Sequence, residues 1–151
     1  MAIRMKTTVT LRAKGTGASH SRCDIAVRDL TFAIDEPSER GGTNAGPTPT
    51  DTALSALIGC TNVIGHKCAE KLSIDVGAIS VEITCDFDRR GVTLAEEIDV
   101  PFVAIRQDVT CSGSARDADL QRLGAEVAKY CPLSKLFEQA GTRLETVWRK
   151  G

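Results

Sequence analysis

Cysteines carry most of the chemistry that this sequence offers. Six of them are spread along the 151 residues: Cys23, Cys60, Cys68, Cys85, Cys111 and Cys131. No two form a Cys-x-x-Cys pair, and the two histidines, His20 and His66, do not complete a metal-binding pattern. With 42% hydrophobic residues the chain can bury a core without disulfides. We therefore expect mostly structural thiols, with one or two that react.

Cys60 lies inside a segment whose hydrophobic pattern predicts a long helix. Pro49 is a good first residue for this helix, with Thr48 or Thr50 as its cap. Asp51 falls in the first turn, where a negative charge is favourable. The segment is apolar on nearly all sides, so we expect a buried helix. Burial raises the pKa of a thiol, and the middle of a helix gives it no help from a helix N-terminus. A reactive Cys60 would thus require an arginine or lysine from elsewhere in the fold, and a structural thiol is the alternative.

Cys131 stands directly before a proline. Because Pro132 disfavours the helical conformation in the residue before it, the helix that opens at Asp117 should stop or bend at Cys131. Proline also suits the first position of a helix, so a short helix is expected over Pro132 to Gln139 with Cys131 at its cap. Unpaired backbone N–H groups at a helix start favour an anion by about 0.3–1 kcal/mol. Cys131 is therefore placed where a thiolate is favoured, although an inert thiol there is the alternative.

The remaining pattern predicts an α+β fold in a single domain over residues 1–151. Alternating residues indicate strands at Thr7–Arg12, at 25–34 with a break near Asp29, at 79–87, more weakly at Ile98–Thr110 around Pro101, and at Leu144–Trp148. A polar turn is expected at 14–20, and a loop rich in Gly, Pro, Thr and Asn at 38–49. Strands, a long helix, two strands, paired helices and a last strand follow one another, which is typical of the α+β class.

Composition excludes several classes of function. A net charge of -1 and a pI near 6.1 argue against a protein that binds nucleic acid through its phosphates. The N-terminal residues lack the apolar run of a signal peptide, and no stretch approaches eighteen consecutive apolar residues. We therefore expect a soluble, cytoplasmic protein that binds neither nucleic acid nor a membrane.

The two cysteine segments together resemble the OsmC/Ohr family. The resemblance lies in the stretch TPTDTALSALIGC, the later YCPLS, and the β-rich first third that ends in a Gly-rich loop. It extends from about Arg22 through Trp148 in the expected order of elements. The resemblance implies an OsmC-like fold, with an antiparallel sheet wrapped around a long buried central helix, in an intertwined homodimer with both sites at the interface. It also implies a thiol peroxidase for organic hydroperoxides that needs no metal or organic cofactor.

The same resemblance assigns roles to particular residues. Cys60 corresponds to the peroxidatic thiolate and Cys131 to the resolving thiol, which a dithiol reductant would restore. The family also places an arginine from the early β region beside the thiolate. That arginine corresponds to Arg22, or to Arg28 if the strand register differs.

One position departs from the family pattern. Ten residues before the helix cysteine, members of the organic hydroperoxide type carry a glutamate that orients the arginine, whereas this chain has Thr50 there. Asp51, the next residue, is the first candidate for replacing it, and Glu39 in the flanking loop is a poorer one. The departure puts the preference for organic hydroperoxides in question but leaves the cysteine pair intact. A second hypothesis is therefore a non-catalytic redox sensor or small-molecule binding protein with the same fold.

Overall fold

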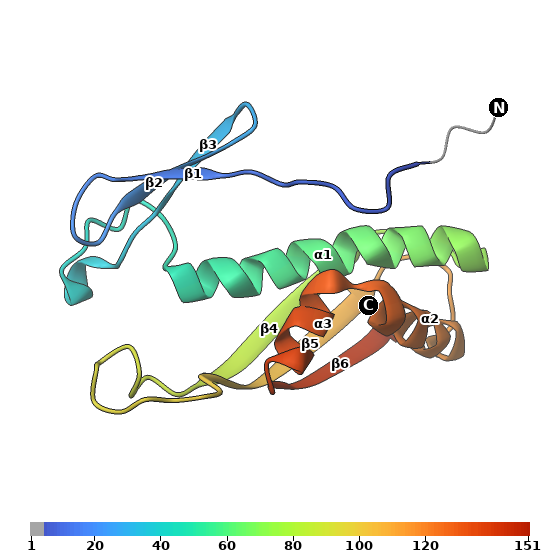
Figure 1. The fold of residues 1–151 in the computed structure, drawn as a ribbon. Coiled ribbons are helices and arrows are strands. Elements are labelled where there is room, and N and C mark those ends of the chain that lie inside the picture. The colour runs from blue at the N-terminus through green and yellow to red at the C-terminus, as the bar shows by residue number, and fades with distance from the viewer. Residues whose placement is uncertain (1–4) are drawn as a thin grey trace. The chain divides into compact units, whose positions relative to one another are not determined.

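The computed structural model describes residues 5–151 (Figure 1). They form two compact units, one that ends at Ala53 and one from Leu54 to Gly151. The long helix α1, Pro49–Leu72, begins in the first unit and continues through the second. Between residues 5 and 151 no helix combines the length and the hydrophobicity needed to cross a membrane. The single domain expected over residues 1–151 stays a prediction.

The first unit contains a three-stranded antiparallel sheet. Its strands are β1 (Lys14–Gly17), β2 (Cys23–Val27) and β3 (Leu30–Ile34), in the order β1-β2-β3. The break expected near Asp29 is the hairpin turn between β2 and β3, where Val27 pairs with Leu30. The strand expected at Thr7–Arg12 is wrong, because pairing begins at Lys14, in the segment expected to be a turn. Alternation gives a strand only where a neighbouring strand supplies hydrogen bonds, and Val9 and Leu11 are exposed.

A buried carboxylate organises the loop between β3 and α1. Asp35 is fully buried and accepts hydrogen bonds from the hydroxyl and the N–H of Thr43 and from the N–H groups of Ala45 and Glu36. These bonds, led by that of the Thr43 hydroxyl, keep the pKa of Asp35 well below its usual range. The loop also contains a short 3-10 helix, η1 (Ser38–Arg40), and is thereby fixed as it approaches α1.

The start of α1 agrees with the sequence and has a definite cap. Thr48 Oγ1 accepts a hydrogen bond from the Asp51 N–H at 3.1 Å. In return, the Asp51 carboxylate accepts bonds from the Thr48 N–H at 3.3 Å and from the Thr48 hydroxyl at 2.7 Å. This reciprocal pair is a capping box, so of the two cap candidates Thr48 takes the role.

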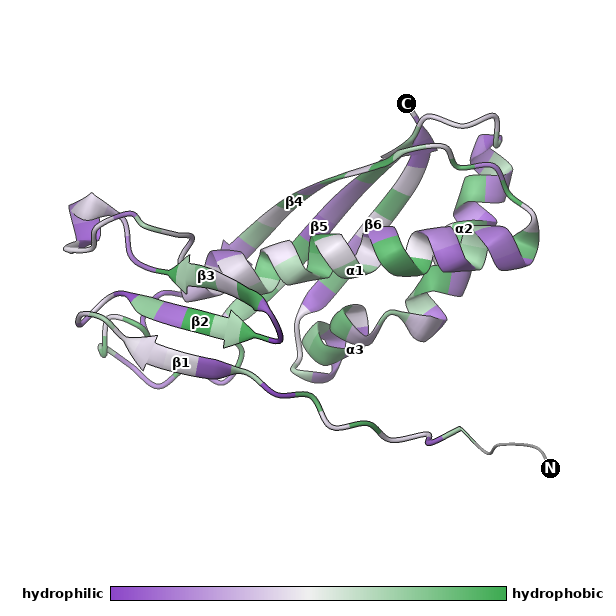
Figure 2. Ribbon diagram, turned by 90° about the horizontal axis from the view of Figure 1, so that it is seen from above, coloured by the Kyte–Doolittle hydropathy of each residue, from purple (hydrophilic) through white to green (hydrophobic). Residues whose placement is uncertain are grey.

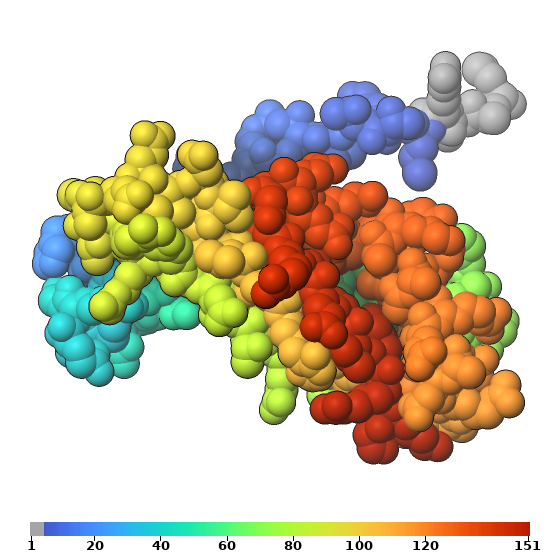
Figure 3. All heavy atoms as spheres, turned by 90° about the horizontal axis from the view of Figure 1, so that it is seen from below, coloured from blue at the N-terminus to red at the C-terminus, as the bar shows by residue number. Residues whose placement is uncertain are grey.

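The second unit contains a mixed sheet with two helices. The strands β4 (Ile79–Phe87), β5 (Phe102–Cys111) and β6 (Arg143–Lys150) lie in that order. The helices α2 (Asp117–Tyr130) and α3 (Pro132–Gln139) connect β5 to β6 and pack against β6; Figure 3 shows β6 in red beside α2 in orange. The antiparallel sheet expected from the resemblance is wrong for β6, which runs parallel to β5. Its long connection through two helices allows the parallel pairing.

The two faces of this sheet differ in polarity. Hydrophobic residues such as Val81, Ile105, Val109 and Trp148 share one face, on which α1 lies, and Gly65 of α1 closely approaches the Trp148 ring. The opposite face carries charged residues joined by ion pairs, among them Arg106, Asp108 and Glu145. Colouring by hydropathy shows this mixture of polar and apolar residues along the strands (Figure 2). The core of the second unit therefore lies between α1 and the inner face.

Only one side of α1 is buried within the described chain. Leu57, Thr61 and Cys68 face the core and are buried. Ala56 and Val63 lie on the other side and are exposed, with Val63 50% exposed. The expectation of a helix buried nearly all round is thus correct for one side alone, because a single sheet covers a single face.

Candidate active site

Cys60 and Cys131 come together within the second unit. Their sulfur atoms lie 3.4 Å apart, and both thiols are free. A disulfide bond is about 2.05 Å long, so a small movement would join the two sulfur atoms. Cys131 is fully buried at 0% exposure, whereas Cys60 is partly exposed. An oxidant arriving from solvent would therefore meet Cys60 first.

Both sulfur atoms lie at the first turn of α3. Cys131 is the N-cap residue of this helix, as its sequence context predicts, and its sulfur accepts a hydrogen bond from the Ser134 N–H at 3.5 Å. The N–H of Leu133 donates to the sulfur of Cys60. The expectation that Cys60 lies away from any helix N-terminus is therefore wrong, because the N-terminus of a different helix reaches it.

Burial dominates the electrostatics of Cys60. Burial raises the pKa of its thiol, the Leu133 amide acts in the opposite direction, and the neighbouring Cys131 thiol raises the pKa further. No lysine or arginine of residues 54–151 is among the groups that shift it. Within that range the Leu133 amide is therefore the group that favours the thiolate of Cys60.

The other cysteines of the second unit resemble structural thiols. Cys68 and Cys111 are buried, and burial raises the pKa of both, as it does for Cys85. Cys23 lies in the first unit, on β2. Among residues 5–151, no group of three His, Cys, Asp or Glu side chains could coordinate a metal ion.

The two candidate arginines lie at opposite ends of β2. Arg22 comes just before the strand, is partly exposed and pairs through Nε with Asp24 at 2.8 Å. Arg28 is in the hairpin turn with a positive φ of 56°. Their assignment relative to Cys60 stays a prediction.

Thr50 and Asp51 both take part in the start of α1. The hydroxyl of Thr50 lies 3.1 Å from that of Thr48, and the Asp51 carboxylate bonds to Thr48 as the cap partner. Asp51 therefore already has a structural role, and any contact with an arginine would add to it.

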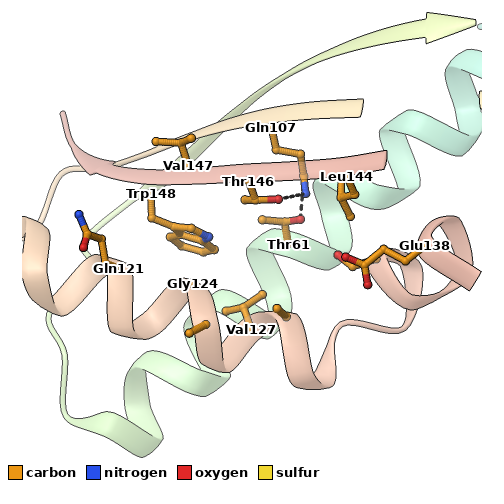
Figure 4. Close-up of a pocket in the computed structure, with 13 residues that line it drawn as sticks. Thr61, Gln107, Gln121, Gly124, Val127, Glu138, Leu144, Thr146, Val147 and Trp148 are labelled. Carbon is orange, nitrogen blue, oxygen red and sulfur yellow. Dashed lines mark hydrogen bonds between the residues drawn. The ribbon is translucent and has the colours of Figure 1, made fainter. Parts of the chain in front are cut away.

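A cavity of about 430 Å³ lies in the second unit, and Thr61, the residue after Cys60, lines it, although neither thiol of the pair does. Its walls come from α2, α3 and β6, and its polar floor is made by Thr61, Gln107 and Thr146 (Figure 4). Ser134, whose N–H bonds to Cys131, also lines it. The sequence predicted that the first-turn amides of α3 favour an anion at Cys131, but it predicted neither a role for Gln107 nor the bond from the Leu133 N–H to Cys60. Gln107 had a signal, since it is a polar residue between Ile105 and Val109 on the inner side of an alternating strand.

Comparison with known protein families identifies the class of this chain. The profile described as OsmC-like protein matches residues 42–147, which include both cysteines of the site. The chain belongs to the OsmC-like protein family, and the resemblance seen in the sequence is confirmed. Curated proteins gave no match to this sequence.

Several solved structures share the fold at low sequence identity. An OsmC-like protein from Mycoplasma pneumoniae has a TM-score of 0.78 at 14% identity, over 94% of this chain and 97% of that one. An organic hydroperoxide resistance protein OsmC from Legionella pneumophila has a TM-score of 0.72 at 15% identity, over 95% and 99%. The organic hydroperoxide resistance protein OhrB of Bacillus subtilis has a TM-score of 0.64 at 17% identity, over 93% and 98%. The α+β fold expected for the chain is thereby confirmed as OsmC-like.

Proposed function

We propose that this protein is a thiol-dependent peroxidase that reduces organic hydroperoxides through Cys60 and Cys131. The observation that carries the proposal is the pair of free thiols 3.4 Å apart, one partly exposed and one fully buried. That arrangement suits a peroxidatic cysteine backed by a resolving cysteine. The names of the solved relatives point to hydroperoxides as the class of substrate.

In the first step the Cys60 thiolate attacks one oxygen of the peroxide bond. The S–O bond forms as the O–O bond breaks, and the departing alkoxide takes a proton to become an alcohol. Cys60 is left as a sulfenic acid, oxidised by two electrons. The Leu133 amide is in place to stabilise the thiolate before this attack.

In the second step the Cys131 thiol attacks the sulfenic sulfur. A disulfide forms and the hydroxyl group leaves as water, which prevents further oxidation of Cys60. An external dithiol then reduces the disulfide by thiol–disulfide exchange and becomes oxidised itself. The cycle needs no metal and no organic cofactor.

Arg22 is proposed to supply the cation that Cys60 lacks within residues 54–151. A guanidinium beside the sulfur would offset the rise in pKa caused by burial. Arg28 is the alternative source. Asp51 and Thr50 are proposed as accessory residues near the start of α1, in place of the glutamate of related proteins.

The working form is proposed to be a homodimer with its sites at the interface. In support, the side of α1 that carries Ala56, Gly59 and Val63 is exposed in the single chain, although these residues are small or apolar. The cytoplasmic location stays a prediction.

A redox sensor that oxidises once is the second candidate. The raised pKa of Cys60 and the presence of Thr50 favour it, since both would lower the rate of reaction with peroxide.

Turnover separates the two candidates. The reduced protein is mixed with an excess of tert-butyl hydroperoxide and a dithiol, and alcohol production is measured with Cys60→Ser and Cys131→Ser alongside. Many equivalents of alcohol per protein, lost in Cys60→Ser, support the peroxidase. A single equivalent per protein with intact dithiol would reject the peroxidase in favour of the sensor.

A further inference from the structure

Gln107 is a polar residue on the apolar inner face of the sheet in the second unit. It is 1% exposed, and its neighbours across the sheet are Ile83 on β4 and Thr146 on β6. Ile105 and Val109 flank it on the same face of β5. A buried amide costs free energy unless its polar atoms are hydrogen-bonded, so a hydrophobic residue would be the simpler choice here.

Hydrogen bonds account for the placement of Gln107. The Thr61 hydroxyl donates to Gln107 Oε1 at 2.9 Å, and Gln107 Nε2 donates to Thr146 Oγ1 at 3.1 Å (Figure 4). Thr61 is itself 1% exposed. These three residues, of which Thr146 is only partly buried, are called the buried triad and connect α1 to β5 and β5 to β6.

The buried triad also joins the two elements that carry the reactive sulfur atoms. Thr61 directly follows Cys60 on α1, so fixing Thr61 fixes the rotation of the helix at Cys60. Thr146 lies on β6, against which α3 packs with Cys131 at its cap. The connection from Thr61 through Gln107 to β6 is therefore a physical link between the two cysteines.

The cavity explains why hydrogen bonds are needed at this place. It is bordered by the triad on one side and by Ser134 of α3 on another, with about 430 Å³ between. Side-chain packing normally fixes the spacing of elements in a core, and packing is missing where the cavity lies. Directional bonds from Thr61 to Gln107 supply the constraint instead.

We propose that the buried triad positions Cys60 relative to Cys131 and thereby determines whether oxidised Cys60 is resolved or overoxidised. The inference rests on the proposed peroxidase function. Thr61, Gln107 and Thr146 bond to one another rather than to either sulfur atom and act through α1, so they are positioning residues.

Two reactions compete for the sulfenic acid at Cys60. In one, the Cys131 thiol attacks the sulfur, and a disulfide and water result. In the other, a second hydroperoxide oxidises the sulfenic acid to a sulfinic acid and is itself reduced to an alcohol. The first reaction depends on the distance between the sulfur atoms, whereas the second depends on peroxide concentration. The ratio of sulfinic acid to disulfide therefore reports on positioning.

Thr61→Val and Thr61→Ser form the central comparison. Valine matches threonine in shape but leaves Gln107 Oε1 without its donor, whereas serine retains the hydroxyl. Each reduced variant is treated with excess tert-butyl hydroperoxide, and the state of Cys60 is read by mass spectrometry of its peptide. Because small misplacements of reacting groups have large effects on rate, we expect Thr61→Val to raise the ratio roughly tenfold. Thr61→Ser should stay near the wild-type ratio.

Two further variants separate positioning from loss of stability. Ile105→Val removes a methylene from the same face of β5 without touching a hydrogen bond, and it should leave the ratio unchanged. Gln107→Met preserves the length of the side chain without its amide and should behave like Thr61→Val. Thermal unfolding of all four variants checks that each variant is folded when its ratio is compared with that of the wild type.

The outcomes distinguish this inference from the function on which it rests. If the wild-type protein forms no disulfide between Cys60 and Cys131, the proposed function fails. If the wild type forms it and Thr61→Val gives the same ratio as Ile105→Val, the positioning role fails while the function stands.

Discussion

At the scale of single residues, burial rather than helix position distinguishes the two thiols. Both sulfur atoms accept hydrogen bonds from the first turn of α3, Cys60 from Leu133 and Cys131 from Ser134. Cys131 is fully buried and Cys60 is not. In the proposed function the partly exposed thiol, Cys60, therefore depends on Arg22 for its ionisation.

That dependence leads to a prediction about Arg22. If its guanidinium stabilises the Cys60 thiolate, Arg22→Ala should raise the pKa of Cys60 and move the rise of reactivity towards alkaline pH. At neutral pH the thiolate fraction would then fall, by about tenfold for each unit of pKa. The measurement is the rate of Cys60 alkylation by iodoacetamide as a function of pH.

Arg28→Ala is the matched control for this experiment. It removes the same charge from the opposite end of β2 and should leave the pH profile of Cys60 unchanged. A shift in Arg28→Ala with none in Arg22→Ala would reverse the assignment of the two arginines.

At the scale of secondary structure, local signals predicted most of the elements. Pro49 and Asp51 indicated the start of α1, and the Cys131-Pro132 pair indicated the junction of α2 and α3. The strand expected at Thr7–Arg12 failed because alternation alone does not show which segment finds a pairing partner.

The candidate site, like the fold, could be predicted from local sequence patterns only in part. A sequence pattern shows that Cys60 and Cys131 are unusual, since each stands in a distinctive local context. It does not show that the backbone amide of Leu133 reaches Cys60, because that contact joins α1 to α3. Contacts between distant elements depend on packing, which no local pattern encodes.

The loop that precedes α1 has a pH dependence whose sign can be stated. Hydrogen bonds keep the pKa of Asp35 in the folded protein below that of the unfolded chain. Its stabilising effect is therefore present above the unfolded pKa and is lost as the pH falls through the folded one. We expect Asp35→Asn to be less stable than wild type near neutral pH, with a difference that shrinks as the pH falls from about 5 towards 2.

Urea unfolding at several pH values tests this prediction for Asp35. Substitution of Asp88 provides a control. The pKa of Asp88 is also lowered, to about 2 by Arg90, but Asp88 lies outside the loop that precedes α1. A difference between wild type and Asp35→Asn that stays constant with pH would contradict the role given to the ionised carboxylate.

At the scale of the whole molecule, the exposed side of α1 predicts how copies of the chain associate. Val63 is 50% exposed on the same side as Gly59, at which an added Cβ would meet no atom within 4 Å. If this side is the interface of the proposed homodimer, Val63→Glu would bury a charge without a partner and should produce monomers. Sedimentation velocity would measure the change.

Val92→Glu is the control for association. Val92 is 65% exposed in the loop after β4, so a charge there should leave the dimer intact. A dimer that survives Val63→Glu would place the interface elsewhere, and a protein that is monomeric without any substitution would reject the dimer.

Peptide mapping, after the reduced protein has reacted with one equivalent of tert-butyl hydroperoxide, tests the proposed roles of Cys60 and Cys131. We expect a single disulfide between Cys60 and Cys131, with the other four cysteines still reduced. In Cys131→Ser, we expect the oxidation to stay on Cys60 as a sulfenic or sulfinic acid. Absence of reaction, or oxidation distributed over Cys23, Cys68 and the remaining thiols, would contradict the proposed cysteine pair.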